Sequence, residues 1–508
     1  MQSEVGVPKQ LAIQAGGGRR SRRTGFFEGP TSSRIRRTRC VAYGFRFRLV
    51  FVVLSIIAAC PVFAATHYAD QLARECDELI ALAVKRPYGW AWAEAGPQAK
   101  PKGGLQAVDF DPPGTAAAGF VLYWCGDFLD RPLYKQAAYN AARGMATAQQ
   151  PTGQIPANPL FSSTGAGGHD PSLLIANRAA SRAALALYLS LFDDTGGKDE
   201  ALRRYAAGPL NWLLKQQGSS GAWPQGIPPT TAPKDAARII RLDTPDYRDS
   251  VFTMLLAYAV PGDIRARLSV EHSIALLTRM RLGSNSKMGE SLWATAYGLD
   301  GYPSQQLPDF PPGVDMRASR HAMQILLTAY VMLDDPPPRD AEKNAWSKPL
   351  ADAATAIGKM PTYEGKWLRR YDLDVATTPA PPSTKPSGFN TQSLTNPPNQ
   401  QTDTWGLATL VEDAQNLADS GRDRFKAALV ANFTIHQRLA AALCGLEDDP
   451  FNVELPVQDE DVSPFLKNHA AKFAALDQPS PALLSDQVRR MYQLLIRAKL
   501  ERRALHQP

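Results

Sequence analysis

The sequence predicts an all-α fold, an α/α toroid of the incomplete (α/α)6 type built from stacked helical hairpins. Landmark residues that follow helix-like runs recur about every 70 residues: 68 residues separate Ile155 from Trp223, 70 separate Trp223 from Trp293, and 74 separate Trp293 from Trp367. Each period contains two stretches with apolar residues at helical spacing, and strand-like alternation is sparse. Because one hairpin of helices cannot bury its own apolar face, the repeats are expected to stack.

The predicted helices come in pairs along the chain. The clearest stretches cover residues 135–149, 179–191, 205–217, 250–259, 269–280 and 349–360. Gly and Pro cluster after every second helix, which indicates a turn there. The recurring Gly-x-Trp has two interpretations: Gly permits the turn while Trp packs across helix ends, or the Trp rings line a cleft and stack on the C–H faces of sugars.

Composition excludes several classes of protein. Of the 508 residues, 44% are apolar and 21% charged, which excludes a wholly disordered chain. Mean hydropathy is −0.27 and only one apolar run approaches spanning length, which excludes a multi-span membrane protein. Residues 1–64 carry eleven Lys and Arg against two acids, so removing that +9 from the total of +7 leaves −2 for residues 65–508. The nearly neutral charge of residues 65–508 predicts no nucleic-acid partner. We also expect a monomer.

Residues 1–64 are predicted to be a basic N-terminal extension and a signal peptide. Arg46 and Arg48 precede the apolar run 49–59, and small residues then lead to a cleavage site after Ala64. The alternative is a lipoprotein anchored through Cys60. Either way the protein is expected to be secreted or periplasmic, with no membrane span in the mature chain. Residues 65–508 form the predicted toroid domain, with a Pro-rich loop at 376–404 followed by C-terminal helices.

Four motifs, in order along residues 85–375, resemble the family-10 polysaccharide lyases, the pectic acid lyases. The matching stretches are Asp111-Pro-Pro-Gly-Thr-Ala-Ala-Ala-Gly119, Gly221-Ala-Trp-Pro-Gln225, Trp293-Ala-Thr-Ala-Tyr297 and Trp367-Leu-Arg-Arg-Tyr-Asp-Leu373. This resemblance implies an α/α toroid outside the cytoplasm that cleaves pectate, or another acidic polysaccharide or oligouronide, by β-elimination. It also implies an Arg as base, helped by Ca²⁺ and acidic ligands.

The resemblance places the predicted catalytic Arg at Arg369, on the Arg of the family's motif, either in contact with the uronate or as the base. β-Elimination removes the C5 proton of a uronate, so it needs a base and cationic groups that stabilise the developing enolate. Predicted substrate-binding residues are the aromatics and arginines near the expected loops. They are Trp223, Trp293, Tyr297, Trp367, Arg370, Arg317 and Arg320. The alternative for Arg369 and Arg370 is a pair of surface arginines.

A cluster of acids follows the Trp-Pro-Gln loop. Asp243 and Asp246 are predicted to be catalytic, and together with Asp249 they are predicted to bind Ca²⁺, which prefers several oxygen ligands. The alternative is that Asp246 caps a helix and the other acids form ion pairs with Arg241 and Arg248.

The chain departs from the family at three places, and two other functions therefore stay open. Thr244 stands where the family has its first Asp, Ala318 where it has Glu, and its Arg-Asp-Gly is missing after residue 373. One alternative is a catalytically inactive glycan-binding toroid. The other is a glycoside hydrolase on the same fold, with Asp109 and Asp111 as a carboxylate pair and Asp300 as partner.

Overall fold

The structure is a computed structural model with two compact units, Met1–Ala64 and Ala65–Pro508. It describes residues 67–94, 105–163, 165, 178–224, 239–282, 291–304, 313–333, 347–360, 362–363, 365–372, 402–403, 406–420, 433–447 and 459–505. All of these residues belong to the second unit. The predicted signal peptide, Cys60 and most of the Pro-rich loop lie outside the described residues, so these predictions are untested.

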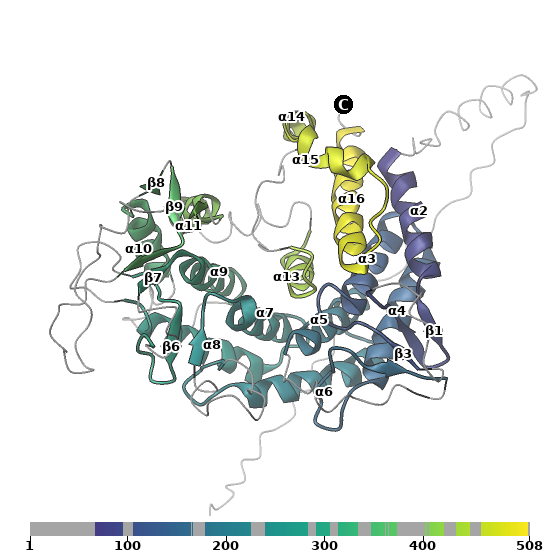
Figure 1. Cartoon of the computed structure of the whole chain (residues 1–508), viewed down its shortest axis with the longest axis horizontal. Coiled ribbons are helices and arrows are strands. Elements are labelled where there is room, and N and C mark those ends of the chain that lie inside the picture. The colour runs from purple at the N-terminus through teal and green to yellow at the C-terminus, as the bar shows by residue number, and fades with distance from the viewer. Residues whose placement is uncertain are drawn as a thin grey trace, which may run out of the picture. The chain divides into compact units, whose positions relative to one another are not determined.

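Four helical hairpins follow one another along the described residues (Figure 1). They are α3 (Thr115–Phe128) with α4 (Pro132–Thr147), α5 (Arg178–Asp194) with α6 (Glu200–Gln216), α7 (Pro245–Ala259) with α8 (Ile264–Arg279), and α9 (Met316–Met332) with α10 (Ser347–Gly358). The first helix of each pair also packs against the first helix of the next. This arrangement confirms the predicted α/α toroid class and all six predicted helical stretches.

Burial distinguishes an inner row, α3, α5, α7 and α9, from an outer row. Every residue of α5 from Ala180 to Phe192 is buried, whereas α8 buries one stripe that includes Val270, Ile274 and Leu277. A helix that is apolar on all sides needs neighbours on all sides, and an amphipathic helix needs them on one. The inner helices have the outer row on one flank, and α5 and α7 also have α13 (Ile435–Leu443) on another.

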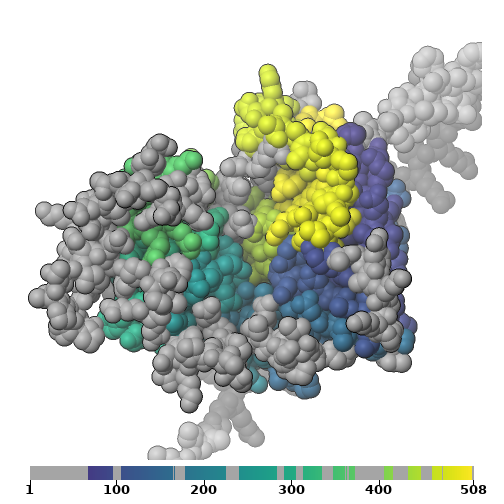
Figure 2. Space-filling model, viewed as in Figure 1, coloured from purple at the N-terminus to yellow at the C-terminus, as the bar shows by residue number. Residues whose placement is uncertain are grey.

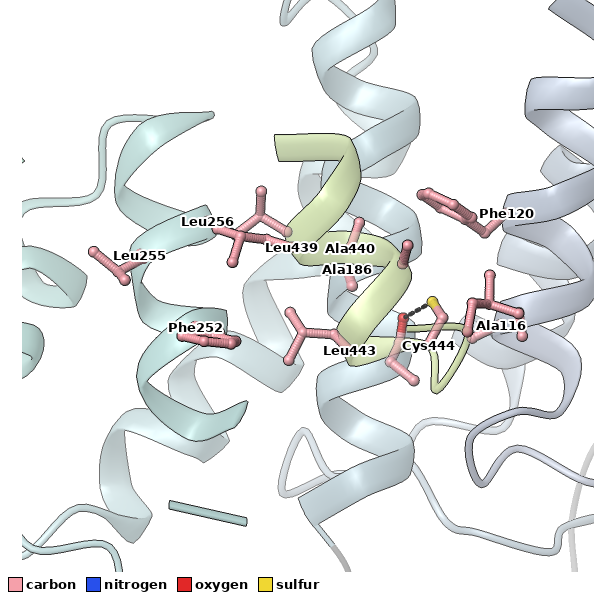
Figure 3. Packing of buried hydrophobic residues seen from close by; sticks show 14 of the residues in the cluster. Ala116, Phe120, Ala186, Phe252, Leu255, Leu256, Leu439, Ala440, Leu443 and Cys444 are labelled. Atoms are coloured by element: carbon pink, nitrogen blue, oxygen red, sulfur yellow. Dashed lines mark hydrogen bonds between the residues drawn. The ribbon is translucent and has the colours of Figure 1, made fainter. Parts of the chain in front are cut away.

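Helix α13 fills the inner side of the row. It packs against α5 and α7, and Figure 3 shows Leu439 and Leu443 facing Phe252 and Leu256 of α7. Cys444, directly after α13, lies near the Ala183 carbonyl oxygen of α5, with a sulfur–oxygen distance of 4.0 Å. Small Ala residues along α13 allow this close packing of helices around it.

The predicted turns after the outer helices are present, and they require Gly. Gly153 has φ +95° and Gly221 has φ +90°, and a Cβ on either would lie 2.3 Å from a backbone carbonyl oxygen of the next outer helix. The residue two positions later then bonds to neighbouring helices: Ile155 N–H donates to Ser181 Oγ, and Trp223 Nε1 donates to Ser273 Oγ.

Short strands connect the helices at the inner-helix N-terminal ends. Antiparallel pairs join β5 (Ile239–Arg241) to β6 (Ala296–Gly298) and β7 (Gly313–Asp315) to β10 (Arg370–Asp372). Similar short pairs join β1 (Val84–Arg86) to β2 (Gly89–Ala91) and β3 (Gln106–Ala107) to β4 (Leu160–Phe161), and β9 (Lys366–Leu368) lies between β8 (Thr362–Tyr363) and β11 (Thr402–Asp403).

The first and last described helices pack together. Helix α16 (Leu484–Leu505) lies beside α2 (His67–Ala81), as Figures 1 and 2 show by the yellow segment against the purple one. Helix α11 (Leu407–Ser420) packs against α9 and α10, and the short helices α14 (Val462–Asn468) and α15 (Ala470–Ala474) precede α16. Cys76, Cys125 and Cys444 are buried free thiols. None of the described helices is long and apolar enough to span a membrane.

Candidate functional site

Charged side chains gather at the N-terminal ends of the inner helices, where the short strands also end. Helices contribute Arg178 and Arg182 at the start of α5, Asp246 and Arg248 at the start of α7, and Asp315 at the cap of α9. All of these except Asp246 are buried, and Asp246 keeps 32% of its side chain exposed. Arg241 at the end of β5, Asp243 and Arg369 lie just outside the helices and complete the group. We refer to this group as the charged end.

Asp243 lies between β5 and α7 and holds two guanidinium groups. It accepts hydrogen bonds from Arg241 Nε at 2.9 Å and Arg241 Nη2 at 2.6 Å, a two-point pair that favours a fixed geometry. Arg369 Nη2 lies 3.4 Å from Asp243 Oδ2. The Asp243 side chain is 2% exposed, but those of Arg241 and Arg369 are 23% and 22% exposed. The carboxylate therefore lies beneath two guanidiniums that reach solvent.

Pairing of β10 with β7 brings Arg369 to this place across the fold. Arg370 lies opposite Asp315 in the register, and the backbone N–H of Met316 donates to the carbonyl oxygen of Arg369 at 2.9 Å. Arg369 Nε is then 3.9 Å from Asp315 Oδ2, and this buried nitrogen makes no hydrogen bond in the structure. A guanidinium keeps its positive charge in proteins, which suits anion binding better than proton abstraction.

Asp315 is a site residue that the sequence analysis missed. Its fully buried carboxylate accepts hydrogen bonds from Ala318 N–H at 2.9 Å and from Thr295 Oγ1 at 3.1 Å. Burial raises the pKa of Asp315, and the negative charge of Asp243 adds to the rise. The sequence alone does not indicate this role, because its partner Arg369 comes from a distant segment, directly before β10.

Asp246 binds two arginines of α5, also missed by the sequence analysis. Arg178 and Arg182 both form ion pairs with its carboxylate, and Arg178 Nη2 donates to the Pro224 carbonyl oxygen at 2.6 Å. Burial alone would raise the pKa of Asp246, but the guanidiniums of Arg182 and Arg178 together lower it. Asp246 is therefore ionised near neutral pH and holds the start of α7 against α5.

The predicted calcium site does not form from Asp243, Asp246 and Asp249. Asp243 and Asp246 each pair with two different arginines, and Asp249 Oδ1 accepts from Arg248 Nε at 2.8 Å. Among the described residues, no three acidic, His or Cys side chains come together as metal ligands. The three acids are ion-pair partners of arginines in the structure, and we assign no step to a metal. Calcium binding stays a prediction.

Two further acids lie at the start of α3. Asp109 Oδ1 accepts from the Asp111 N–H at 3.0 Å, and Gly114 allows the tight approach, because a Cβ there would lie 2.6 Å from the Asp109 and Asp111 carbonyl oxygens. Burial raises the pKa of Asp109 to about 6, and the charges of Asp111 and Glu94 contribute. Burial also raises the pKa of Asp111, whereas the charge of Arg182 lowers it. Asp300, the predicted hydrolytic partner, is exposed and accepts from Tyr302 N–H at 3.1 Å.

Three of the predicted sugar-binding aromatics are core residues, which corrects their assignment. Trp223, Trp293 and Tyr297 are at most 1% exposed. Trp293 Nε1 donates to the Leu277 carbonyl oxygen at 2.9 Å, and Tyr297 Oη accepts from Ala294 N–H at 2.6 Å. Their rings fill the space between helix ends, so no ring face is open to a pyranose. Of the two interpretations of the Gly-x-Trp repeat, this is the one in which Trp packs across helix ends.

The remaining predicted binding residues are partly exposed. Trp367, Arg370, Arg317 and Arg320 all have intermediate burial, and the last two are in the first turns of α9. Next to them, His321 is buried, and its Nδ1 donates to the Leu242 carbonyl oxygen at 2.7 Å. Burial and the charges of Arg248, Arg320 and Arg317 lower the pKa of His321 well below its usual value, so it is neutral. The charged end thus keeps several cationic groups at its surface.

Comparisons with known proteins give a weak likeness. No family model matches the chain, and no curated protein matches it either. A family 105 glycoside hydrolase of C. acetobutylicum is 14% identical, with 66% of this chain and 78% of that chain covered and a TM-score of 0.38. A cold-adapted family 8 xylanase is 11% identical, with 86% and 90% covered and a TM-score of 0.36.

A third similar structure is the cellobiose 2-epimerase of Spirochaeta thermophila, 15% identical, with 58% of this chain and 72% of that chain covered and a TM-score of 0.33. None of the three is a lyase by name, and no family model supports the lyase resemblance, which stays a prediction. The proposals below therefore rest on the side chains of this chain.

Proposed function

We propose that this protein binds an acidic, uronate-containing polysaccharide at the charged end and cleaves it by β-elimination. The observation that carries the proposal is the pair of partly exposed guanidiniums, Arg241 and Arg369, held over the buried carboxylate of Asp243. Guanidinium groups recognise carboxylates through parallel hydrogen bonds, and buried acids that fix their orientation reduce the entropy lost on binding.

The same arrangement suits the chemistry of elimination. A base removes the C5 proton, the electron pair forms the C4–C5 double bond, and the glycosidic oxygen leaves from C4 and takes up a proton to become a hydroxyl. Negative charge develops on the uronate carboxylate meanwhile, and Arg369 and Arg241 are positioned to stabilise it. Asp109 has a pKa of about 6, so it can exchange a proton near neutral pH. In this proposal Arg369 contacts the uronate, which is one of its two predicted roles, and Asp243 and Asp315 position it.

Hydrolysis is the second candidate function, and the raised pKa of Asp109 favours it. A carboxyl group that stays protonated up to pH 6 can donate a proton to a leaving glycosidic oxygen. The two reactions share the binding arginines but differ in product. Elimination leaves an unsaturated sugar that absorbs ultraviolet light, whereas hydrolysis leaves only a new reducing end.

The test incubates the purified protein with polygalacturonate, alginate and a glucuronan, with and without Ca²⁺. We expect ultraviolet absorbance to rise, and Arg369→Ala to reduce the rate about 100-fold, as for loss of one transition-state donor. Arg369→Lys should restore part of that rate. The matched control Arg203→Ala removes an exposed arginine of α6, 67% exposed, and should leave the rate unchanged.

Each other outcome has a defined meaning. New reducing ends without absorbance would replace elimination by hydrolysis. Binding of uronan without either product would indicate the glycan-binding alternative. If Arg369→Ala bound and cleaved uronans as well as the unaltered protein, the charged end would not be the site.

A further inference from the structure

Two of the described cysteines lie against each other in the interior. Cys76 belongs to α2 and Cys125 to α3, two helices that pack together, and both side chains are fully buried. The Cys76 thiol donates a hydrogen bond to the Cys125 sulfur. The two sulfur atoms are therefore neighbours, although their residues stand 49 positions apart in the chain.

The third described cysteine has other surroundings. Cys444 follows α13, and its sulfur lies 4.0 Å from the Ala183 carbonyl oxygen of α5. Burial alone raises the pKa of Cys444, whereas burial, followed by the hydrogen bond to Cys125, raises the pKa of Cys76. Among the described cysteines, contact between two thiols therefore distinguishes Cys76 and Cys125 from Cys444.

We propose that Cys76 and Cys125 are the site of a disulfide that forms when the chain folds in the presence of a disulfide oxidant, and that Cys444 stays a free thiol. The structure holds all three as thiols. A disulfide requires Cα atoms about 4.4–6.8 Å apart and side chains that point at each other. Packed helices whose sulfurs share a hydrogen bond meet the second requirement. The inference is independent of the proposed function, because neither cysteine belongs to the charged end.

Exchange with oxidised glutathione, a small disulfide, supplies the oxidation. One cysteine thiolate attacks a glutathione sulfur, and one glutathione leaves as a thiolate and is protonated. The second cysteine thiolate then attacks the mixed disulfide and displaces the other glutathione, which is protonated in turn. The protein loses two S–H bonds and gains one S–S bond, while one glutathione disulfide takes up two electrons and two protons and becomes two thiols.

Packing sets the order of events. Helix α16 packs against both α2 and α3, and its Lys499 lies close enough to Cys125 for their charges to interact. Burial, the hydrogen bond to Cys125 and the charges of Asp77 and Glu75 raise the pKa of Cys76, whereas the attacking species is the thiolate. The disulfide therefore forms while the chain folds, before α16 packs in place, and burial then protects it from reduction.

The disulfide ties the first described helix to the toroid. Helix α2 is amphipathic and buries one face, which includes Leu72, Cys76 and Leu79. Joining Cys76 to Cys125 closes a loop of about 50 residues, and a closed loop restricts the unfolded chain more as it becomes longer. We therefore expect the oxidised chain to be the more stable to heat.

The test folds the purified full chain from denaturant in two ways, with a mixture of reduced and oxidised glutathione or with dithiothreitol. Free thiols are then blocked and the chain is digested with trypsin. With glutathione, we expect peptide 75–85 to be joined to peptide 103–135 in most chains, and peptide 439–467, which carries Cys444, to be blocked. The melting temperature should be about 2–8 °C higher than that of the sample folded with dithiothreitol.

Matched variants separate the disulfide from the loss of a buried thiol. Cys125→Ser should abolish both the joined peptides and the difference in melting temperature, whereas Cys444→Ser should keep both. The inference is overturned if the unaltered chain folded with glutathione has no joined peptides, if Cys444 pairs instead, or if the two samples melt at the same temperature. The peptide map of the unaltered chain decides the pairing even where a variant does not fold.

Discussion

Two arginine–carboxylate clusters in this molecule contain the same kinds of ion pair but differ in how exposed their arginines are. At the junction of α2 and α16, Arg490 Nε donates to Glu75 at 2.9 Å, and its Nη1 and Nη2 donate to the carbonyl oxygens of Ala475 and Leu476. Both charged side chains there are less than a tenth exposed. At the charged end, Asp243 is equally buried, but Arg241 and Arg369 keep over a fifth of their side chains in solvent.

The difference shows how to recognise a candidate binding cluster among structural ones. Each guanidinium nitrogen of Arg490 bonds within the protein, so this buried group is not available to a ligand. Its role is to join elements that are distant in sequence. A guanidinium held by a buried acid but left partly exposed is oriented and still accessible. Three experiments test this distinction.

The largest expected effect is on stability at the α2–α16 junction. Glu75→Ala leaves the buried Arg490 without its carboxylate, and we expect the free energy of unfolding to fall by about 3–5 kcal/mol. Chemical denaturation measures it. Glu271→Ala, at a partly exposed pair on α8, is the control and should cost under about 1 kcal/mol. A loss for Glu75→Ala no greater than this control would contradict the structural role.

A smaller effect on stability is expected at the charged end. Asp243→Ala frees Arg241 and Arg369 to hydrate, and it removes a buried carboxylate, so the free energy of unfolding should fall by only about 1–2 kcal/mol. Binding of oligouronide should weaken about tenfold, because the arginines lose their fixed geometry. Denaturation and calorimetric titration measure the two effects. A large loss of stability with unchanged affinity would make this cluster a structural one too.

The smallest effect concerns the pH dependence of stability. The pKa of Asp109 in the folded state is about 6, above its usual value of 3.8, so its contribution to stability is full below pH 3.8 and is lost as pH rises through 6. Asp109→Asn should remove this slope. The measurement compares the melting temperatures of the variant and the unaltered protein between pH 4 and pH 7. Asp127→Asn, in the surface pair with Lys135, is the control. Parallel curves for the two proteins would show that Asp109 titrates normally.

Much of the fold was predictable because it depends on local patterns. The helical period of apolar residues located six helices, and the spacing of Gly-x-Trp landmarks located the turns between hairpins. Gly221 is an example in which a local rule is sufficient: its positive φ and the backbone of the next outer helix leave no room for a side chain. The predicted export signal and Pro-rich loop lie outside the described residues and stay predictions.

Less of the site was predictable, because its members come from different periods. Asp243 and Arg369 are both predicted site residues, and they do meet. Asp246 and Asp249 are predicted to join Asp243 as calcium ligands, but in the structure they pair with other arginines. Trp223 and Trp293 are predicted sugar-binding residues, whereas their burial makes them core residues. The sequence pattern cannot distinguish a Trp that packs across a helix end from one that lines a cleft, because both follow the same Gly-containing turn.

The sequence by itself therefore determined the repeat, the helical hairpins and the presence of acids and arginines beside the turns. Only the tertiary structure decided which charges pair. Pairing of β10 with β7 brings Arg369 to Asp315, and packing of α5 on α7 brings Arg178 to Asp246. The physical reason is that helical periodicity is a property of neighbours in the chain, whereas ion pairing depends on distances of a few ångströms between residues 50 to 130 positions apart.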